Sequence, residues 1–267
     1  MNVREPAAGR PLLVERAGAV ETFIINNAPR NAMNLEFMDA LEAEVARVAH
    51  DGAVRALVIR GAGNENFSVG MDLKQLFQNI AQRGNLEAVL DQRLRVLAAI
   101  ENLPKPVVAV LCGYCLGGGL ELPLACHFRV AAADGARIGL PELDLGTVPA
   151  WGGSARLTRC VGEQHALDMI LRARKISGQE ALRIGLVSEV WPLAELFDRA
   201  HDLATELAGM PAVAVAAMLG CIVGARDKSL EKSIAEERRA VLATMGTSDQ
   251  SEGMQAFLEK RRPVFNR

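Results

Sequence analysis

The sequence is poor in aromatic residues and carries almost no net charge. Aromatic side chains make up only 4% of the 267 residues, whereas hydrophobic residues make up 50%. A core of this composition is built mainly from aliphatic side chains, as in ordinary globular domains. The 30 basic and 32 acidic residues give a formal charge of −2. This balance excludes the strong positive field of a protein that binds nucleic acid or anionic membranes non-specifically.

Signatures of disulfides, metal sites, export and membrane insertion are also missing. The five cysteines are odd in number and stand mostly in apolar stretches, so we expect free thiols and a cytoplasmic protein. Cys112 and Cys115 form a single C-x-x-C pair, and the four histidines lack a ligand spacing, so no metal is expected. The first residues contain no apolar signal-peptide segment. The uncharged run from Pro106 to Leu120 is too short and glycine-rich to span a membrane.

Strand and helix patterns alternate along the first two thirds of the chain. Residues 12–25 predict a β-hairpin, and Asn34 is the expected N-cap of an amphipathic helix. A strand over 66–70 is expected to run into a helix, followed by a helix with Leu86, Leu90, Leu94 and Leu97 on one face. Further buried strands are predicted at 55–61, 106–113 and 128–132. This alternation favours an α/β fold of mostly parallel strands covered by helices.

The last quarter of the chain has a nearly continuous helical pattern. It follows a strand-like stretch that ends at Pro192, and its breaks fall at Pro211 and Gly224. We therefore expect a core over residues 1–192 and a C-terminal helical segment over residues 193–267. The sequence shows no repeat and no linker long enough to separate two independent domains.

Three consecutive glycines, Gly117 to Gly119, stand between a predicted buried strand and a short helix that contains Glu121. Bare backbone admits a ligand closely, and free N–H groups at a helix start suit a phosphate or a developing oxyanion. The Lys and Ser/Thr of a phosphate-binding Walker motif are absent, as is G-x-G-x-x-G spacing. Because a carboxylate repels phosphate, an oxyanion hole beside an acid or base is favoured. Close packing of the glycines and an exposed Glu121 remain the alternative.

A second carboxylate, Glu142, follows the next predicted strand in the stretch "GLPELDLG". Two carboxylates that face one cavity can share general acid and base work, and burial tends to raise the pKa of at least one of them.

Several stretches, in their order and spacing, resemble the crotonase or enoyl-CoA hydratase/isomerase superfamily. They are "APRNAMN", "NFSVGMDL", "KPVVAVLCGYCLGGGLELPLACHFRVAA", "IGLPELDLGTVPAWGGSARLTR", "ISGQEALRIGLVSEV" and "EGMQAFLEKRRPVF". The resemblance implies the crotonase fold of repeated ββα units, with a C-terminal helical segment that forms trimers, often paired into hexamers. It also implies an acyl-CoA thioester substrate and no cofactor beyond the coenzyme A of that substrate.

The resemblance further implies a role for particular residues. Backbone N–H groups of Met71 and Gly118 would form the oxyanion hole for a thioester enolate. Glu121 would act mainly on the nucleophilic water, and Glu142 would exchange the proton of the α-carbon, although a shared role is equally compatible. The implied contacts to substrate and coenzyme A are Arg30, Ala32, Asp72, Leu73, Gly117, Trp151, Phe257 and Lys260. Phe257 and Lys260 would reach the nucleotide from a neighbouring subunit, with a solvated charge as the alternative for Lys260.

Two departures from the family pattern bear on the substrate. His127 stands where the family commonly has Asp, and we expect it to be structural. Ala150 and Trp151 replace smaller residues in the stretch "PAWGGSARL", and Trp151 is expected to narrow or reshape the acyl pocket.

The resemblance thus implies hydration of a short or functionalised 2-enoyl-CoA, with methylthioacryloyl-CoA as one specialised substrate. A Δ3-Δ2 enoyl-CoA isomerase and an acyl-CoA hydrolase remain alternatives, because they use the same enolate-stabilising amides. A catalytically silent member that binds RNA or scaffolds a partner is the alternative outside enzymes, and the near-neutral charge argues against it.

Overall fold

A six-stranded sheet forms the centre of the protein. The structure is a computed structural model that describes residues 9–267. The strands are β1 (Leu12–Ala17), β2 (Val20–Ile25), β3 (Ala56–Gly61), β4 (Val107–Leu111), β6 (Phe128–Ala132) and β8 (Glu189–Trp191), in the order β1-β2-β3-β4-β6-β8. β1 and β2 form an antiparallel hairpin, and every other pair is parallel. All five residues of β4 are buried, as expected for a parallel sheet covered on both faces.

A second, two-stranded sheet lies beside the first and leads to the glycine triplet. Its parallel strands are β5 (Tyr114–Leu116) and β7 (Arg137–Gly139). The helix α4 (Gly118–Leu124) follows β5 directly, and the short 3-10 helix η2 (Glu142–Leu145) follows β7. Because β5 and β7 are parallel neighbours, the segments at their carboxyl ends emerge side by side. This arrangement brings the two predicted catalytic stretches together.

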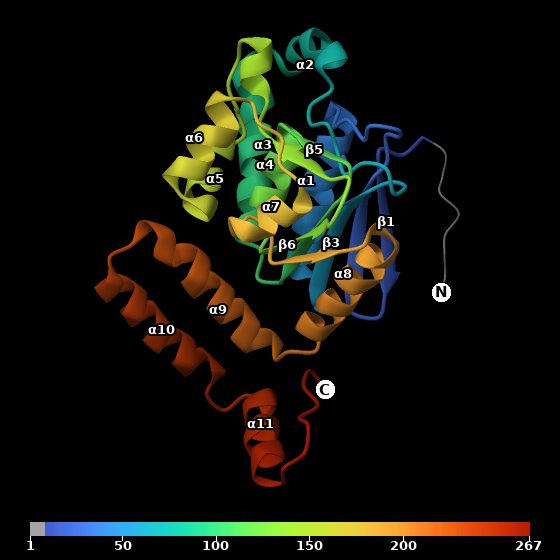
Figure 1. Cartoon of the computed structure of the whole chain (residues 1–267). Helices are drawn as coiled ribbons and strands as arrows, with labels where there is room; N and C mark the ends of the chain where they lie inside the picture. The colour runs from blue at the N-terminus through green and yellow to red at the C-terminus, as the bar shows by residue number, and fades with distance from the viewer. Residues whose placement is uncertain (1–8) are drawn as a thin grey trace.

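Helices surround both sheets. α1 (Leu35–His50) packs against α3 (Leu86–Glu101), and α2 (Leu76–Arg83), after the 3-10 turn η1 (Leu73–Gln75), also packs against α3. α5 (Gly153–Val161) packs against α4 and against α6 (Glu163–Leu171), and α7 (Gly178–Arg183) contacts β7 and β8. In Figure 1 these helices gather around the sheets at the upper part of the molecule.

The last four helices fall into two groups. α8 (Leu193–Ala208) buries Leu196, Ala200, Ala204 and Ala208 and contacts five strands of the main sheet. α9 (Ala212–Gly224), the 3-10 turn η3 (Ala225–Asp227), α10 (Leu230–Thr244) and α11 (Ser248–Leu258) form an arm that extends away from the sheets (Figure 1). The helical pattern after residue 192 is thus confirmed. The division at 192/193 stays a prediction, and α8 packs as part of the layered core.

The predicted hairpin, parallel sheet and Asn34-capped helix are confirmed, but two expectations were wrong in detail. Residues 66–70 form no regular strand; Ser68 and Met71 make only single bridges, to Cys115 and Met33. Leu86 and Leu94 of α3 are 46% and 39% exposed. The buried face of α3 instead comprises Val89, Gln92, Arg93, Val96, Leu97 and Ile100. It contains two polar residues, so a search for a purely apolar stripe selected the wrong face.

Within residues 9–267, no single helix is long and apolar enough to cross a membrane; α8 and the stretch Ala212–Asp227 pass that test only together, as a pair bent by 106°. Across the same residues, no group of His, Cys, Asp and Glu side chains is arranged to hold a metal ion.

The N-cap of α1 should contribute measurably to stability. The Asn34 side chain accepts a hydrogen bond of 2.9 Å from the Phe37 N–H, which satisfies one donor of the first helical turn. We expect Asn34→Ala to lower the free energy of unfolding by about 1 kcal/mol in urea denaturation. Asn34→Ser, which keeps an acceptor, is the control. Equal losses in both variants would contradict the capping role.

Candidate active site

The glycine triplet is required by close contacts on three sides. Gly117 has a φ of +56°, and a Cβ on it would lie 2.9 Å from Glu142 Oε1. A Cβ on Gly118 would lie 2.4 Å from Cζ3 of Trp151, and one on Gly119 would lie 2.2 Å from the Ser68 carbonyl oxygen. Side chains at these positions would overlap their neighbours, so the first turn of α4 packs bare backbone against a carboxylate, an indole ring and another chain segment.

Glu121 is held inside the protein by two backbone amides. Its side chain is buried at 2% exposure. Oε1 accepts hydrogen bonds from the N–H groups of Trp151 (2.7 Å) and Gly153 (2.8 Å), at the start of α5. Burial raises the pKa of Glu121 to about 7, the two amides oppose that rise, and the nearby Glu142 carboxylate adds to it. A carboxyl with this pKa can exchange a proton near neutral pH.

Glu142 reaches the same place from η2. Its Oε1 approaches Gly117, and its Oε2 is buried without a hydrogen-bond partner in residues 9–267. Burial raises the pKa of Glu142 as well. The structure therefore brings together the two carboxyl groups selected from the sequence. One of them carries a buried oxygen without a hydrogen-bond partner in residues 9–267, an arrangement that is uncommon in folded proteins.

The two backbone groups selected for an oxyanion hole also lie close together. A Cβ on Gly70, the neighbour of Met71, would lie 2.8 Å from the Gly118 nitrogen. Neither the Met71 N–H nor the Gly118 N–H donates a hydrogen bond to the described part of the chain. Two unoccupied donors, one of them at the start of α4, lie near two carboxyl groups and form an arrangement suited to stabilising a developing oxyanion.

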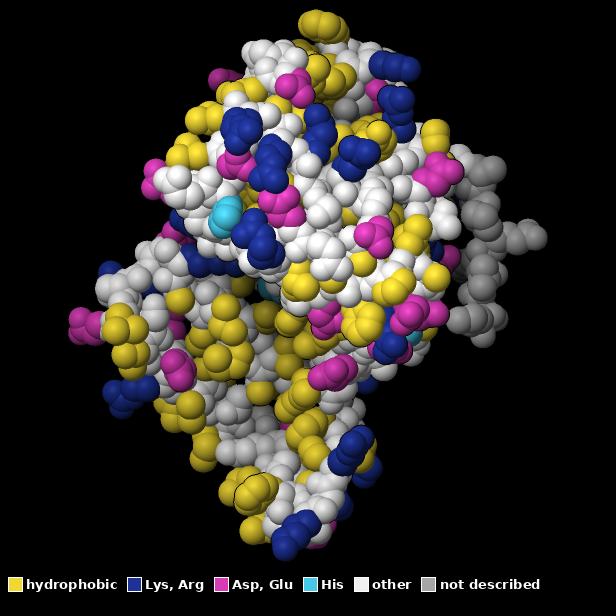
Figure 2. All heavy atoms as spheres, in the orientation of Figure 1, with side chains coloured by type: hydrophobic (Ala, Val, Ile, Leu, Met, Phe, Trp, Pro, Cys, Tyr) yellow, Lys and Arg dark blue, Asp and Glu magenta, His cyan; other side chains and the backbone are white. Residues whose placement is uncertain are grey.

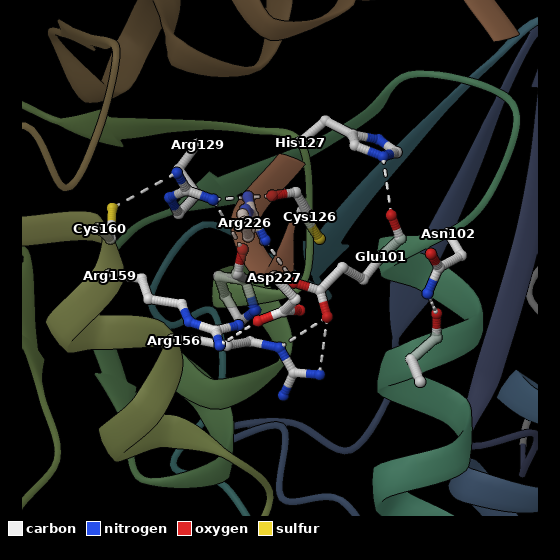
Figure 3. Close-up of polar contacts among 12 residues, drawn as sticks. Glu101, Asn102, Cys126, His127, Arg129, Arg156, Arg159, Cys160, Arg226 and Asp227 are labelled. Carbon is white, nitrogen blue, oxygen red and sulfur yellow. Dashed lines mark hydrogen bonds and ion pairs between the residues drawn. The ribbon is translucent and has the colours of Figure 1, made fainter. Parts of the chain in front are cut away.

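A polar cluster braces the loop that holds Glu121 (Figure 3). Nη1 of Arg156 on α5 donates to the Trp151 carbonyl oxygen (2.9 Å), and its Nε and Nη2 donate to Glu101 Oε2 (3.1 and 3.0 Å) at the end of α3. Arg226 of η3 donates to the other oxygen of Glu101 at 2.5 Å. Sequence analysis missed Glu101, Arg156 and Arg226. The sequence shows only that Arg156 follows the "GGS" stretch. Glu101 is 55 residues from Arg156 and 125 residues from Arg226 along the chain, so no local pattern indicates these contacts.

His127 lies beside this cluster (Figure 3). Its Nδ1 accepts from the Val107 N–H (3.0 Å), and its Nε2 lies 3.3 Å from the Glu101 carbonyl oxygen. Burial lowers the pKa of His127, so the ring is neutral at physiological pH. These contacts agree with the expected structural role.

Comparisons with known proteins identify the family of this chain. The family model described as enoyl-CoA hydratase/isomerase matches residues 15–267. A probable enoyl-CoA hydratase of Bacillus subtilis is 37% identical over 252 residues, which cover 92% of this chain and 96% of the relative. The 2,3-dehydroadipyl-CoA hydratase of Escherichia coli is 34% identical, with 95% and 98% covered. The crystal structure of an enoyl-CoA hydratase from Bacillus anthracis superposes with a TM-score of 0.89 at 33% identity, with 96% and 98% covered.

The chain belongs to the enoyl-CoA hydratase/isomerase family. Its fold is the crotonase fold of that family, and it is an enzyme of the enoyl-CoA hydratase type, a hydro-lyase. The resemblance stated from the sequence is thus confirmed. The roles of its individual residues stay predictions.

The remaining candidate contacts of this hydratase fall into two groups. Arg30 and Ala32 lie in the exposed loop before α1, and the Arg30 carbonyl accepts from the Val69 N–H (3.1 Å), which joins that loop to the Met71 segment. Asp72 caps η1 by accepting from the Lys74 N–H, and Leu73 is 52% exposed. Their contacts to substrate and coenzyme A stay predictions.

Phe257 and Lys260 are not brought to the site within one chain. Phe257 is 82% exposed on α11, and Lys260 follows that helix; α11 is far from α4 in Figure 1. A contact between these residues and coenzyme A would have to come from another copy, as the resemblance implies.

The raised pKa of Glu121 should be visible as a dependence of stability on pH. The folded chain keeps this proton up to about pH 7, whereas the unfolded chain loses it near 4.5, so folded-state stability falls as pH rises through that window. We expect Glu121→Gln to gain about 3 kcal/mol relative to the parent over this range in urea denaturation. Asp144→Asn, at a carboxylate 59% exposed, is the control. A pH-independent difference would contradict the raised pKa.

Arg156 should act on catalysis through the Trp151 loop. Arg156→Met removes the bonds to the Trp151 carbonyl and Glu101, so we expect kcat for crotonyl-CoA hydration to fall about 10- to 100-fold. Because the Arg156 charge lowers the pKa of Glu121, the midpoint of the pH profile should also move upward. Arg159→Met, at a side chain 51% exposed on the same helix, is the control. An unchanged kcat and pH profile would show that the cluster is purely structural.

Proposed function

We propose that this hydratase adds water across the double bond of a short or functionalised 2-enoyl-CoA, using Glu121 and Glu142 as the acid-base pair. The observation that carries the proposal is the convergence of the buried Glu121 and the partly buried Glu142 carboxyl groups on the glycine triplet, beside the unoccupied N–H groups of Met71 and Gly118. No metal or cofactor is needed for this chemistry beyond the coenzyme A of the substrate.

In the proposed reaction, the thioester carbonyl accepts the Met71 and Gly118 N–H groups. The Glu121 carboxylate takes one proton from water, and the hydroxyl oxygen bonds to the β-carbon while the electrons of the double bond move onto the thioester as an enolate. Glu142, in its acid form, which the burial that raises its pKa favours, donates its proton to the α-carbon. The two amides stabilise the enolate most when its charge is greatest, which is the requirement for catalysis.

Two carboxyl groups favour hydration over the alternatives. An isomerase moves one proton between two carbons and needs a single acid-base group, whereas hydration handles a water proton and a carbon proton separately. Family membership does not fix the acyl group, since the relative from Escherichia coli is named for 2,3-dehydroadipyl-CoA. Methylthioacryloyl-CoA remains one candidate. The five free cysteines agree with the expected cytoplasmic location.

The arm α9–α11 is proposed to form a trimer, or a hexamer of paired trimers. Figure 2 shows hydrophobic side chains gathered over this lower part of the molecule. Ile222, Leu230, Leu242 and Phe257 are 61–82% exposed in the single chain. An apolar surface of this extent is typical of an interface between subunits, and such an interface would bring a neighbour's Phe257 and Lys260 toward the coenzyme A.

The paired-acid mechanism can be tested with crotonyl-CoA. We expect Glu121→Gln and Glu142→Gln each to lower kcat about 10²- to 10⁴-fold, measured as loss of the enoyl absorbance. Asp144→Asn, two residues from Glu142 on the exposed side of η2, should keep near-parental rates. A full hydration rate in either glutamine variant would overturn the mechanism.

Product mass separates the alternative reactions. Hydration of crotonyl-CoA adds the mass of one water, hydrolysis releases free coenzyme A, and isomerisation leaves the mass unchanged. Free coenzyme A, or an unchanged mass with a moved double bond in a 3-enoyl-CoA, would replace the proposed function by a hydrolase or an isomerase.

A further inference from the structure

Arg93 is a fully buried arginine without a carboxylate partner. It lies in the middle of α3 at 0% exposure. Arginine is almost never fully buried unless it is paired, because an uncompensated charge in a protein interior is costly. Its position on the packed face of α3 therefore calls for a counter-charge.

Only one nitrogen of the Arg93 guanidinium, Nη1, donates hydrogen bonds to described protein atoms. Nη1 donates to the Val89 carbonyl oxygen (2.9 Å) and to Gln92 Oε1 (3.5 Å). Nε and Nη2 are buried and have no hydrogen-bond partner in the described chain. Asp39, the acid whose charge acts on Arg93, is already bound by Arg83 and by Gln92 Nε2 (2.6 Å).

The two unpartnered nitrogens lie on one edge of the guanidinium. Nε–H and Nη2–H point in nearly parallel directions, and this pair of donors matches the two oxygens of a carboxylate. Burial lowers the pKa of Arg93 only to about 10, so the group keeps its positive charge at neutral pH. Nε–H and Nη2–H could therefore donate two parallel hydrogen bonds to one carboxylate.

Trp151 connects Arg93 to the reaction site. The Arg93 Cζ lies 5.6 Å from the centre of the Trp151 ring. The same ring rests against the Cα of Gly118, and the Trp151 N–H binds Glu121. One indole therefore separates Arg93 from the proposed oxyanion hole. On α2, which packs against α3, Asn79 Nδ2 is a further buried donor without a partner in residues 9–267.

We propose that Arg93 binds a carboxylate at the distal end of the acyl group, so that the preferred substrates are 2-enoyl-CoA thioesters of short dicarboxylic acids. The inference rests on the proposed hydration for its position relative to the double bond. Arg93 is then a specificity-determining residue, because the enzyme leaves a buried charge unpaired whenever the acyl chain ends in a methyl group.

Matched substrates test the preference in the unmodified enzyme. Hex-2-enedioyl-CoA and hex-2-enoyl-CoA differ only in a terminal carboxylate in place of a methyl group. We expect kcat/KM to be at least about 10-fold higher for the dicarboxylic thioester, mainly through KM, given the strength of a desolvated bidentate pair. Equal values, or a preference for hex-2-enoyl-CoA, would overturn the proposal and leave the hydratase function standing.

Variants locate the effect at Arg93. We expect Arg93→Met to lower kcat/KM for hex-2-enedioyl-CoA by about 100-fold and to change the value for hex-2-enoyl-CoA by less than about 5-fold. Arg95→Met, at an exposed position on the same helix, is the matched control. Equal losses on both substrates in Arg93→Met would show that Arg93 is structural and would contradict the proposal.

A binding measurement separates this inference from the proposed reaction. Adipyl-CoA and hexanoyl-CoA are saturated and cannot be hydrated, so calorimetry reports recognition alone. If adipyl-CoA binds more tightly than hexanoyl-CoA and Arg93→Met removes the difference, the carboxylate site is supported. This holds even if both enoyl thioesters are unreactive, because that result would contradict only the proposed hydration. Equal affinities for the two saturated thioesters would count against the site itself.

Discussion

The contact on which the active site depends is the pair of hydrogen bonds from the Trp151 and Gly153 amides to Glu121. These bonds join the first turn of α4 to the start of α5. They fix the carboxyl group, and they also hold the Trp151 ring against Gly118, where no side chain could fit. The same two hydrogen bonds therefore fix the Glu121 carboxyl group and the position of the Trp151 ring beside it. A shift of the loop would disturb both.

This loop is in turn connected to distant parts of the chain. Arg156 binds the Trp151 carbonyl from one side and Glu101 from the other, and Glu101 also binds Arg226 of η3, the turn between α9 and α10 (Figure 3). The pair between Arg156 and Glu101 is only 14% and 16% exposed, so solvent screens it less than a surface ion pair. The arm that is proposed to form the subunit interface is thus tied, through two ion pairs, to the loop that holds Glu121.

The sequence predicted well those features that are local or carried by motifs. The hairpin, the Asn34 cap and the parallel strands follow from short-range patterns. Glu121 and Glu142 were selected from their surroundings in the chain. The polar contacts between α3, α5 and η3 were not found, because residues such as Glu101 and Arg226 meet only after the helices pack. The buried face of α3 was missed for the related reason that it includes Gln92 and Arg93, which a hydrophobic pattern assigns to solvent.

Glu121 and Arg93 are buried and Glu142 is partly buried, and the three groups differ in how they can avoid the cost of burial. Glu121 and Glu142 can take up a proton, and burial raises the pKa of each; a neutral carboxylic acid is also what the proposed protonation of the α-carbon requires. Arg93 has no such route, because its pKa stays near 10 and it remains charged. Its compensation must come from a negative charge outside the described protein atoms. The same burial that prepares two carboxyl groups for proton transfer thus leaves the arginine in need of an anion, which the proposed distal carboxylate of the acyl group would supply.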